Sequence, residues 1–194
     1  MNVSLRWLEE LLGTSLDPVE TRDRLLMLGA GVEAMEPLHH DLAEVVIGEV
    51  LEVRKHPNAD RLTLCEVNAG AEVKHVVCGA TNVTAGKKYP FAAVGTTLPG
   101  GLLLERRKIR GEVSEGMLCS AKELGLGEDG DGILELDTAA TPGTRLLDAL
   151  PLADTRFVLE ITPNRPDQLS HEGIARDLGA VLKRPVKLAP VTGG

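Results

Sequence analysis

The sequence predicts an α+β protein in which an all-β barrel is inserted into a small discontinuous domain. Residues 1–38 and 152–190 carry helical patterns, whereas residues 39–151 carry short alternating apolar segments broken by glycine and proline. Many short strands with frequent turns are typical of a small closed barrel. Because the two ends of a domain often lie close together, the flanking segments can form one domain around the barrel.

Two helices are expected in the first flank. The first covers residues 5–12, with leucines on one face, Ser4 as its N-cap and Gly13 as its terminator. The second starts with Asp17 as its N-cap and Pro18 in the first helical position, and ends before Gly29. We interpret this pair as core helices; a docking surface is the alternative.

Alternating segments in the middle of the chain predict the strands of the barrel. Residues 45–53 and 62–67 alternate on either side of a turn at 57–60, and shorter strands are expected at 73–78, 89–94, 102–109 and 133–136. Residues 120–125 are typical of a single capped helical turn.

The last flank predicts mixed structure. A strand is expected over 157–161, a rigid turn over 162–167 and a helix over 168–182. The chain then ends in small residues without a closing element, so we expect residues 191–194 to be a truncated linker.

Composition excludes several classes of protein. The apolar runs extend over a few residues only, whereas a membrane helix needs roughly 20. The first residues also lack the charged-then-apolar order of a signal peptide, so we expect a cytoplasmic protein without membrane contact. The net charge is −8, and residues 39–151 hold 12 basic and 17 acidic side chains. A polyanion would therefore have to meet a local basic patch.

Motifs for catalysis or cofactor binding are absent from the sequence. Glycine-rich phosphate loops, a G-x-S-x-G nucleophile motif and H-E-x-x-H do not occur. The three cysteines are widely spaced without C-x-x-C, so we expect buried thiols and no metal site. Aromatic residues make up only 2%, so an RNA-binding role would rely on shape and backbone.

A basic cluster at residues 106–110 is the main candidate for a binding surface. On a strand, Arg106, Lys108 and Arg110 would share one face at about 6.6–7 Å spacing, which suits successive phosphates of a nucleic acid. Arg54, Lys55 and Arg61 form a second basic group and Lys87–Lys88 a third. The alternative is a solvated strand face balanced by Glu105 and Glu112.

Three ordered segments resemble a known family. The segments VLEVRKHPNADRL (50–62), VCGATNV (77–83) and KIRGEVSEGMLCS (108–120) are similar to the signatures of the structure-specific tRNA-binding OB-fold. The flanking segments NVSLRWL (2–8) and LEITPNRPDQLSHEGIARD (159–177) resemble bacterial phenylalanyl-tRNA synthetase beta subunits. The resemblance covers essentially the whole chain, as the N-terminal part of such a subunit.

This resemblance implies a role in charging tRNA with phenylalanine. Enzymes of the family are heterotetramers of two alpha and two beta subunits that use ATP and Mg²⁺. Their aminoacylation site is in the alpha subunit and their editing site in later parts of beta. We therefore expect neither a catalytic site nor a bound cofactor in this chain.

The resemblance also implies tRNA binding by the barrel. The candidate residues are Arg54, Lys55, Arg61, Arg106, Lys108, Arg110 and Ser114. A structural module that positions the editing domain or neighbouring subunits, without direct tRNA contact, is the alternative. Internal pairing of the cations with Glu105, Glu112 or Glu115 would favour that alternative.

Overall fold

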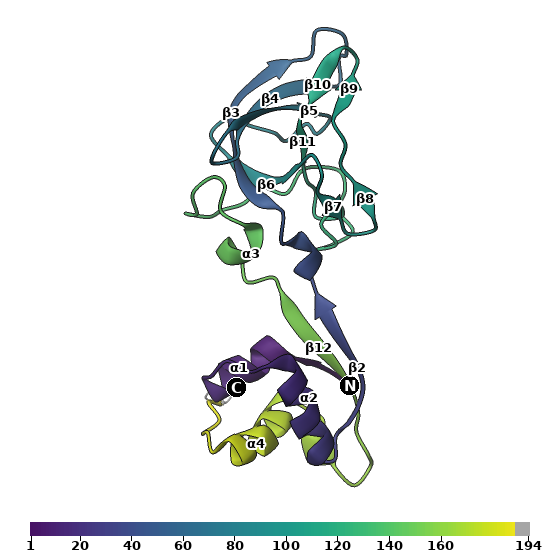
Figure 1. Ribbon diagram of the computed structural model, residues 1–194, viewed down its shortest axis with the longest axis vertical. Coiled ribbons are helices and arrows are strands. Elements are labelled where there is room, and N and C mark those ends of the chain that lie inside the picture. The colour runs from purple at the N-terminus through teal and green to yellow at the C-terminus, as the bar shows by residue number, and fades with distance from the viewer. Residues whose placement is uncertain (189–194) are drawn as a thin grey trace, which may run out of the picture. The chain divides into compact units, whose positions relative to one another are not determined.

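The computed structural model describes residues 1–188, and the chain forms two compact units in it. One consists of Met1–Leu38 and the described chain after Leu152, and the other of His39–Leu152 (Figure 1). The linker expected at 191–194 lies outside the described residues. The predicted fold class, an α+β protein with an inserted barrel, is confirmed.

The first unit contains a three-stranded antiparallel sheet in the order β1-β12-β2. Its central strand β12 (Asp154–Glu160) comes from the second flank, and pairs with β1 (Asn2–Ser4) and β2 (Gly31–Leu38) from the first. The two flanks of the chain are therefore joined by backbone hydrogen bonds into one sheet.

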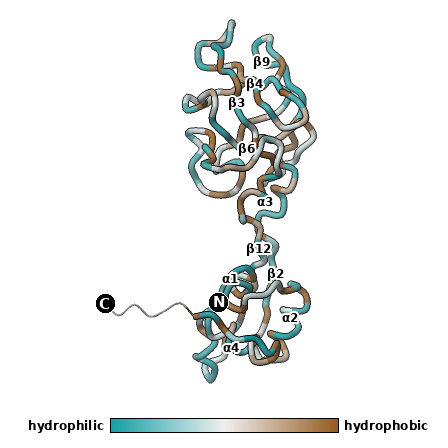
Figure 2. The backbone as a smooth tube through the Cα atoms, turned by 90° about the vertical axis from the view of Figure 1, so that its left-hand side faces the viewer, coloured by the Kyte–Doolittle hydropathy of each residue, from teal (hydrophilic) through white to brown (hydrophobic). Residues whose placement is uncertain are grey.

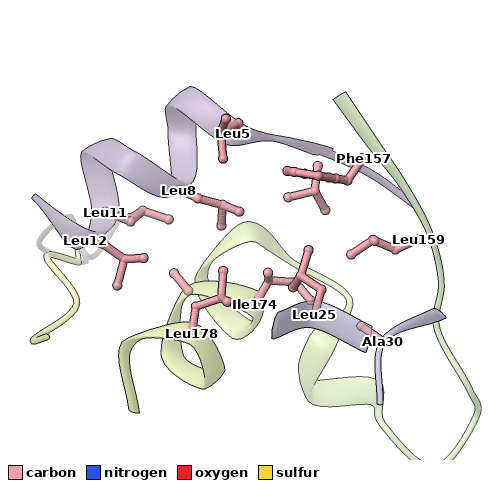
Figure 3. Packing of buried hydrophobic residues seen from close by; sticks show 12 residues of the cluster. Leu5, Leu8, Leu11, Leu12, Leu25, Ala30, Phe157, Leu159, Ile174 and Leu178 are labelled. Atoms are coloured by element: carbon pink, nitrogen blue, oxygen red, sulfur yellow. The ribbon is translucent and has the colours of Figure 1, made fainter. Parts of the chain in front are cut away.

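Helices α1 (Leu5–Leu12), α2 (Pro18–Met27) and α4 (His171–Leu182) supply the rest of this unit's core. In Figure 3, leucines of α1 point toward Ile174 and Leu178 of α4, beside Phe157 of β12. These side chains are buried, as is Leu25 of α2, so both predicted helices contribute to the core.

Local capping sets the helix ends. The Ser4 hydroxyl accepts a hydrogen bond from Trp7 N at 3.0 Å, and Gly13, at φ 62°, ends α1 as predicted. The Asp17 carboxylate likewise caps α2 through Glu20 N at 2.8 Å. Helix α4 begins later than residue 168, because a 3-10 turn, η2 (Pro166–Gln168), precedes its N-cap Ser170.

The second unit is a barrel based on a five-stranded antiparallel sheet in the order β11-β6-β3-β4-β5. Its strands are β3 (Val46–Lys55), β4 (Thr63–Asn68), β5 (Val73–Cys78), β6 (Lys88–Ala93) and β11 (Gly116–Leu118). The buried rings of Tyr89 and Phe91 belong to its core, and the three cysteines are buried free thiols, as predicted. A 3-10 turn, η1 (His40–Leu42), and the short helix α3 (Leu146–Ala149) complete the unit.

Two small hairpins replace the single strand expected at 102–109. They consist of β7 (Thr97–Leu98) with β8 (Leu102–Leu103), and of β9 (Arg107–Ile109) with β10 (Glu112–Ser114). The strand expected at 133–136 is wrong as well. That segment makes only single backbone hydrogen bonds, from Leu134 N to Cys119 O and from Leu136 N to Lys88 O, so no ladder develops.

Candidate nucleic-acid interface

The β9–β10 hairpin carries the basic cluster. Its strands are joined by a two-residue turn, Arg110-Gly111, in which both residues have positive φ (52° and 107°). Such a turn matches the twist of a hairpin. Arg110 therefore lies at the tip of the hairpin, and the expectation that it shares a strand face with Arg106 and Lys108 is wrong. All three side chains are nevertheless exposed, and Figure 2 shows hydrophilic colouring around β9.

The second basic group lies at the adjoining β3–β4 connection. Arg54 and Lys55 end β3, and Arg61 stands just before β4. All three are exposed. The register of β3 and β4 places Arg54 opposite Leu64 and Lys55 opposite Thr63, so this group lies at one end of the sheet.

A buried histidine connects these two basic segments. His56 is 5% exposed, and its Nδ1 accepts a hydrogen bond from Asn58 N at 3.0 Å. Because Nδ1 is an acceptor, the ring proton lies on Nε2, which donates to Ile109 O at 3.1 Å. The Asn58 amide adds a hydrogen bond to Arg110 O at 3.3 Å. The hairpin and the β3–β4 connection therefore form one surface.

Sequence reasoning did not assign a role to His56 or Asn58. Both belong to the segment His-Pro-Asn-Ala-Asp in the first of the three signatures, which is the one signal that could have drawn attention to them. They position the cations through backbone carbonyls of residues more than fifty positions later.

Two of the predicted cations are paired with carboxylates. Arg54 contacts Glu66 at 2.7 Å and Glu52 at 3.3 Å, and Arg106 contacts Glu115 at 2.8 Å. The arginine side chains are 55% and 66% exposed, so the pairs are surface ion pairs of about 0–1 kcal/mol. A phosphate can compete with carboxylates held this weakly.

The other four predicted cations have no carboxylate partner among the described residues. Within residues 1–188, Lys55, Arg61, Lys108 and Arg110 have exposed side chains that form no ion pair. Each can meet a phosphate without first releasing a carboxylate. We call these four residues the open cation set.

Arg54 and Arg106 line one groove of about 510 Å³. Its walls come from β3, β4, β5 and the β9–β10 hairpin with its flanking residues, and His75, Glu112 and Glu115 are among the lining side chains. The groove thus brings together one arginine from each basic group, although acidic side chains accompany both.

Ser114 is not brought to the surface. It is 7% exposed; its hydroxyl accepts a hydrogen bond from Val77 N at 3.1 Å and donates one to Gly116 O at 2.9 Å. With the bond from Glu115 N to His75 O, it connects β5 to the β10–β11 segment. Ser114 therefore closes the barrel.

The lysines of the third basic group bind other parts of the barrel itself. Lys88 Nζ donates to the carbonyls of Thr138 and Ala140 at 3.0 and 2.8 Å. Lys87 pairs with Glu135 at 2.6 Å, and this carboxylate raises the pKa of Lys87 above its usual range. Neither lysine joins the surface formed by the other two groups.

Within the described residues, no helix is both long enough and apolar enough to cross a membrane. In residues 1–188, no group of three or more His, Cys, Asp or Glu side chains is arranged to hold a metal ion.

Comparison with known proteins shows to which family this chain belongs. Residues 45–145 match the family model described as "Putative tRNA binding domain". The chain is 46% identical over 191 residues to the phenylalanine–tRNA ligase beta subunit of Syntrophus aciditrophicus (strain SB), covering 98% of this chain and 24% of that protein. The same subunit of Geobacter metallireducens is 48% identical over 189 residues, with 97% and 24% covered.

Among solved structures, a MetRS-related protein from Pyrococcus horikoshii matches 53% of this chain and 87% of its own, at 24% identity and a TM-score of 0.40. The chain spans about a quarter of the length of the curated relatives it matches. The resemblance to phenylalanyl-tRNA synthetase beta subunits is confirmed over nearly the whole chain. The chain belongs to the tRNA-binding domain family, through the barrel that carries both exposed basic groups.

Proposed function

We propose that the barrel unit binds tRNA through the surface formed by the β3–β4 connection and the β9–β10 hairpin. The observation that carries this proposal is the link from His56 and Asn58 to the hairpin backbone, which holds two basic segments together. The open cation set would contact phosphates directly. Arg54 and Arg106 would assist once tRNA phosphates replace their carboxylate partners.

The balance of charge makes this binding weak and strongly dependent on salt. Residues 39–151 have an excess of five negative charges, so the attraction comes from the local cations alone. Each phosphate neutralised contributes roughly 0.7–0.9 to the slope of log affinity against log salt. Four contacts by the open cation set would therefore give a slope of about −3.

Recognition would depend mainly on the RNA backbone. Single-strand readers stack bases on exposed aromatic rings. Here Tyr89 and Phe91 are 0% and 1% exposed, so both rings belong to the core. The surface would accordingly respond to the spacing of phosphates, with little preference for sequence.

In the complete enzyme, this chain would act as the tRNA-binding part of a phenylalanine–tRNA ligase beta subunit. We propose a cytoplasmic assembly with alpha subunits, two of each kind, that charges tRNA with phenylalanine using ATP and Mg²⁺. No residue of this chain is assigned to either cofactor or to catalysis. Its contribution would be to hold the tRNA.

Fluorescence anisotropy of labelled, unfractionated tRNA tests the proposal at low and moderate salt. The test variant changes Arg106, Lys108 and Arg110 to Glu. The control changes Lys87, Lys122 and Arg145 to Glu, which alters net charge equally elsewhere on the barrel. We expect salt-sensitive binding that is lost in the test variant and reduced less than threefold in the control. Equal losses in both variants, or no binding by the native chain, would contradict the proposal.

A structural module is the second candidate function, and one observation favours it. Arg54 and Arg106 are paired internally with Glu66 and Glu115, as expected of cations that support the fold. In that case tRNA binding would be absent, and Glu66→Gln or Glu115→Gln would lower barrel stability. If tRNA binds instead, Glu115→Gln should strengthen binding because it frees Arg106, and Glu66→Gln should do so less because Glu52 still contacts Arg54.

A further inference from the structure

A small apolar pocket lies beside the basic hairpin and is not used by the proposed phosphate contacts. Its volume is about 170 Å³. Leu102 and Leu103 of β8, Ile109 of β9 and Met117 of β11 line it, and Arg107 and Glu105 add charged groups to its wall. Figure 1 shows β8 and β9 on the same side of the barrel.

Two adjacent leucines at this pocket are unusually exposed. Leu102 is 44% exposed and Leu103 is 50% exposed. Together they form the whole of the short strand β8. Their hairpin reverses through Gly100 and Gly101, both at positive φ (85° and 83°). The barrel therefore presents apolar side chains to solvent next to its basic hairpin.

The charge around the pocket suits a polyanion with an apolar part. Arg107 and Ile109 point to the pocket side of the hairpin, whereas Arg106 lines the groove on the other side. The Arg107 side chain is 64% exposed, and its nearest carboxylate, on Glu105, is 3.9 Å away. Because successive side chains of a strand point to opposite faces, Lys108 points away from this pocket, and Arg107 is the cation that can hold a phosphate beside it.

We propose that this pocket takes one unstacked base of bound tRNA, an inference that rests on the proposed function. Leucine side chains would cover the faces of the base, and the planar guanidinium of Arg107 would stack on it. The barrel has no exposed aromatic ring in its described residues, so these groups supply the stacking surface instead. An apolar protein segment is the competing occupant, but its binding would not require the adjacent cations.

The experiment compares two RNA probes of equal length by anisotropy: an unstructured single strand and a blunt duplex. Leu103→Ser removes apolar surface from the pocket without adding charge. Arg107→Lys keeps the charge but removes the planar guanidinium. Val94→Ser is the matched control, since Val94 is an apolar barrel residue, 43% exposed, that does not line this pocket.

The base pocket predicts a selective loss. Leu103→Ser and Arg107→Lys should each weaken single-strand binding at least about fivefold, because stacking one base contributes that much or more. Duplex binding should change less than twofold in both, and Val94→Ser should match the native chain on both probes.

Other outcomes would overturn the inference in distinguishable ways. Single-strand binding unchanged by both variants would exclude a base from the pocket, and would leave an apolar protein segment as the occupant, while salt-sensitive RNA binding would keep the proposed function intact. If the native chain binds neither probe even at low salt, the proposed function fails together with the pocket.

Discussion

The Nε2 of His56 lies 3.1 Å from the carbonyl oxygen of Ile109, and this contact connects residues 53 positions apart. It joins the end of β3 to the strand that leads into the Arg110 turn. Because His56 is buried and its other ring nitrogen is also engaged, the contact can hold both basic segments in place.

His56→Ala should loosen this surface without removing a cation. The change leaves Ile109 O without its partner, which costs about 1–3 kcal/mol of barrel stability. The salt-sensitive affinity for tRNA should fall several-fold as the two basic segments separate. Urea unfolding followed through Tyr89, the single tyrosine and a barrel core residue, measures the first effect. The exposed Asn58→Ala provides a milder variant, and equal tRNA affinity in all three proteins would contradict this role of His56.

Ser114→Ala should act on stability rather than on the salt dependence of binding. Without the hydroxyl, Val77 N and Gly116 O lose their partner at the closure of the barrel, at a cost of about 1–2 kcal/mol. The slope of log affinity against log salt should stay as in the native chain, because no phosphate contact is lost. A slope reduced by about one contact, with unchanged stability, would show that Ser114 binds tRNA directly.

Gly173→Ala should destabilise the first unit. An added Cβ would lie 1.7 Å from Asp167 O, so the backbone of η2 or α4 would have to move. We expect a loss of at least about 2 kcal/mol. Trp7 is the single tryptophan and lies in this unit, so its fluorescence reports the unfolding. Gly31→Ala is the control, since its Cβ would come no closer than 3.4 Å to Glu160. Equal stability of the two variants would contradict the packing described.

The first unit should lose stability in mild acid because of His171. Its Nε2 accepts a hydrogen bond from Ser4 N at 2.9 Å, and its ring stacks on Trp7 at a centroid distance of 4.0 Å. Burial holds the pKa of His171 below its usual value of 6.5, and the carboxylate of Asp154 partly opposes this shift. With the folded pKa lowered, the neutral ring's stabilising contribution is fully present above pH 6.5 and is lost as the pH falls through the folded value.

Unfolding monitored by Trp7 fluorescence between pH 7.5 and 5 measures this loss. His171→Gln keeps an acceptor for Ser4 N but cannot titrate, so its stability should vary less across this interval. Parallel pH profiles for the native chain and the variant would rule out His171 as the source.

Helices were predictable from sequence because their signals are local. Ser4 and Gly13 bound α1 at the expected positions, and Asp17 with Pro18 starts α2. Strand β2 has no such signal: its side chains are mostly half-buried, and its partner β12 comes more than a hundred residues later. The break at residues 104–106 between β8 and β9 was also missed, because each of these strands pairs within its own hairpin, β8 with β7 and β9 with β10, and the alternation does not show this.

The sequence was enough to identify the cations of the candidate site, but not to predict that they would lie on one surface. The cations stand out in the sequence, and all six are exposed in the structure. What joins the β3–β4 connection to the β9–β10 hairpin is the pair of contacts from His56 and Asn58 to the hairpin backbone, and alternation of residue types does not predict these contacts. Ser114 shows the converse: it was predicted as a binding residue, but its hydroxyl is buried and bonded to Val77 N and Gly116 O at the closure of the barrel.

The most direct measurement is the salt dependence of tRNA affinity for the native chain and for single alanine variants of Lys55, Arg61, Lys108 and Arg110. The account predicts that each variant lowers the magnitude of the log–log slope by roughly 0.7–0.9, and that Lys55→Ala combined with Lys108→Ala lowers it by about twice as much. Lys122→Ala should leave the slope unchanged. Native slopes in the Lys55 and Lys108 variants, with the same affinity as the native chain, would contradict the central claim that these two basic segments form one tRNA-binding surface.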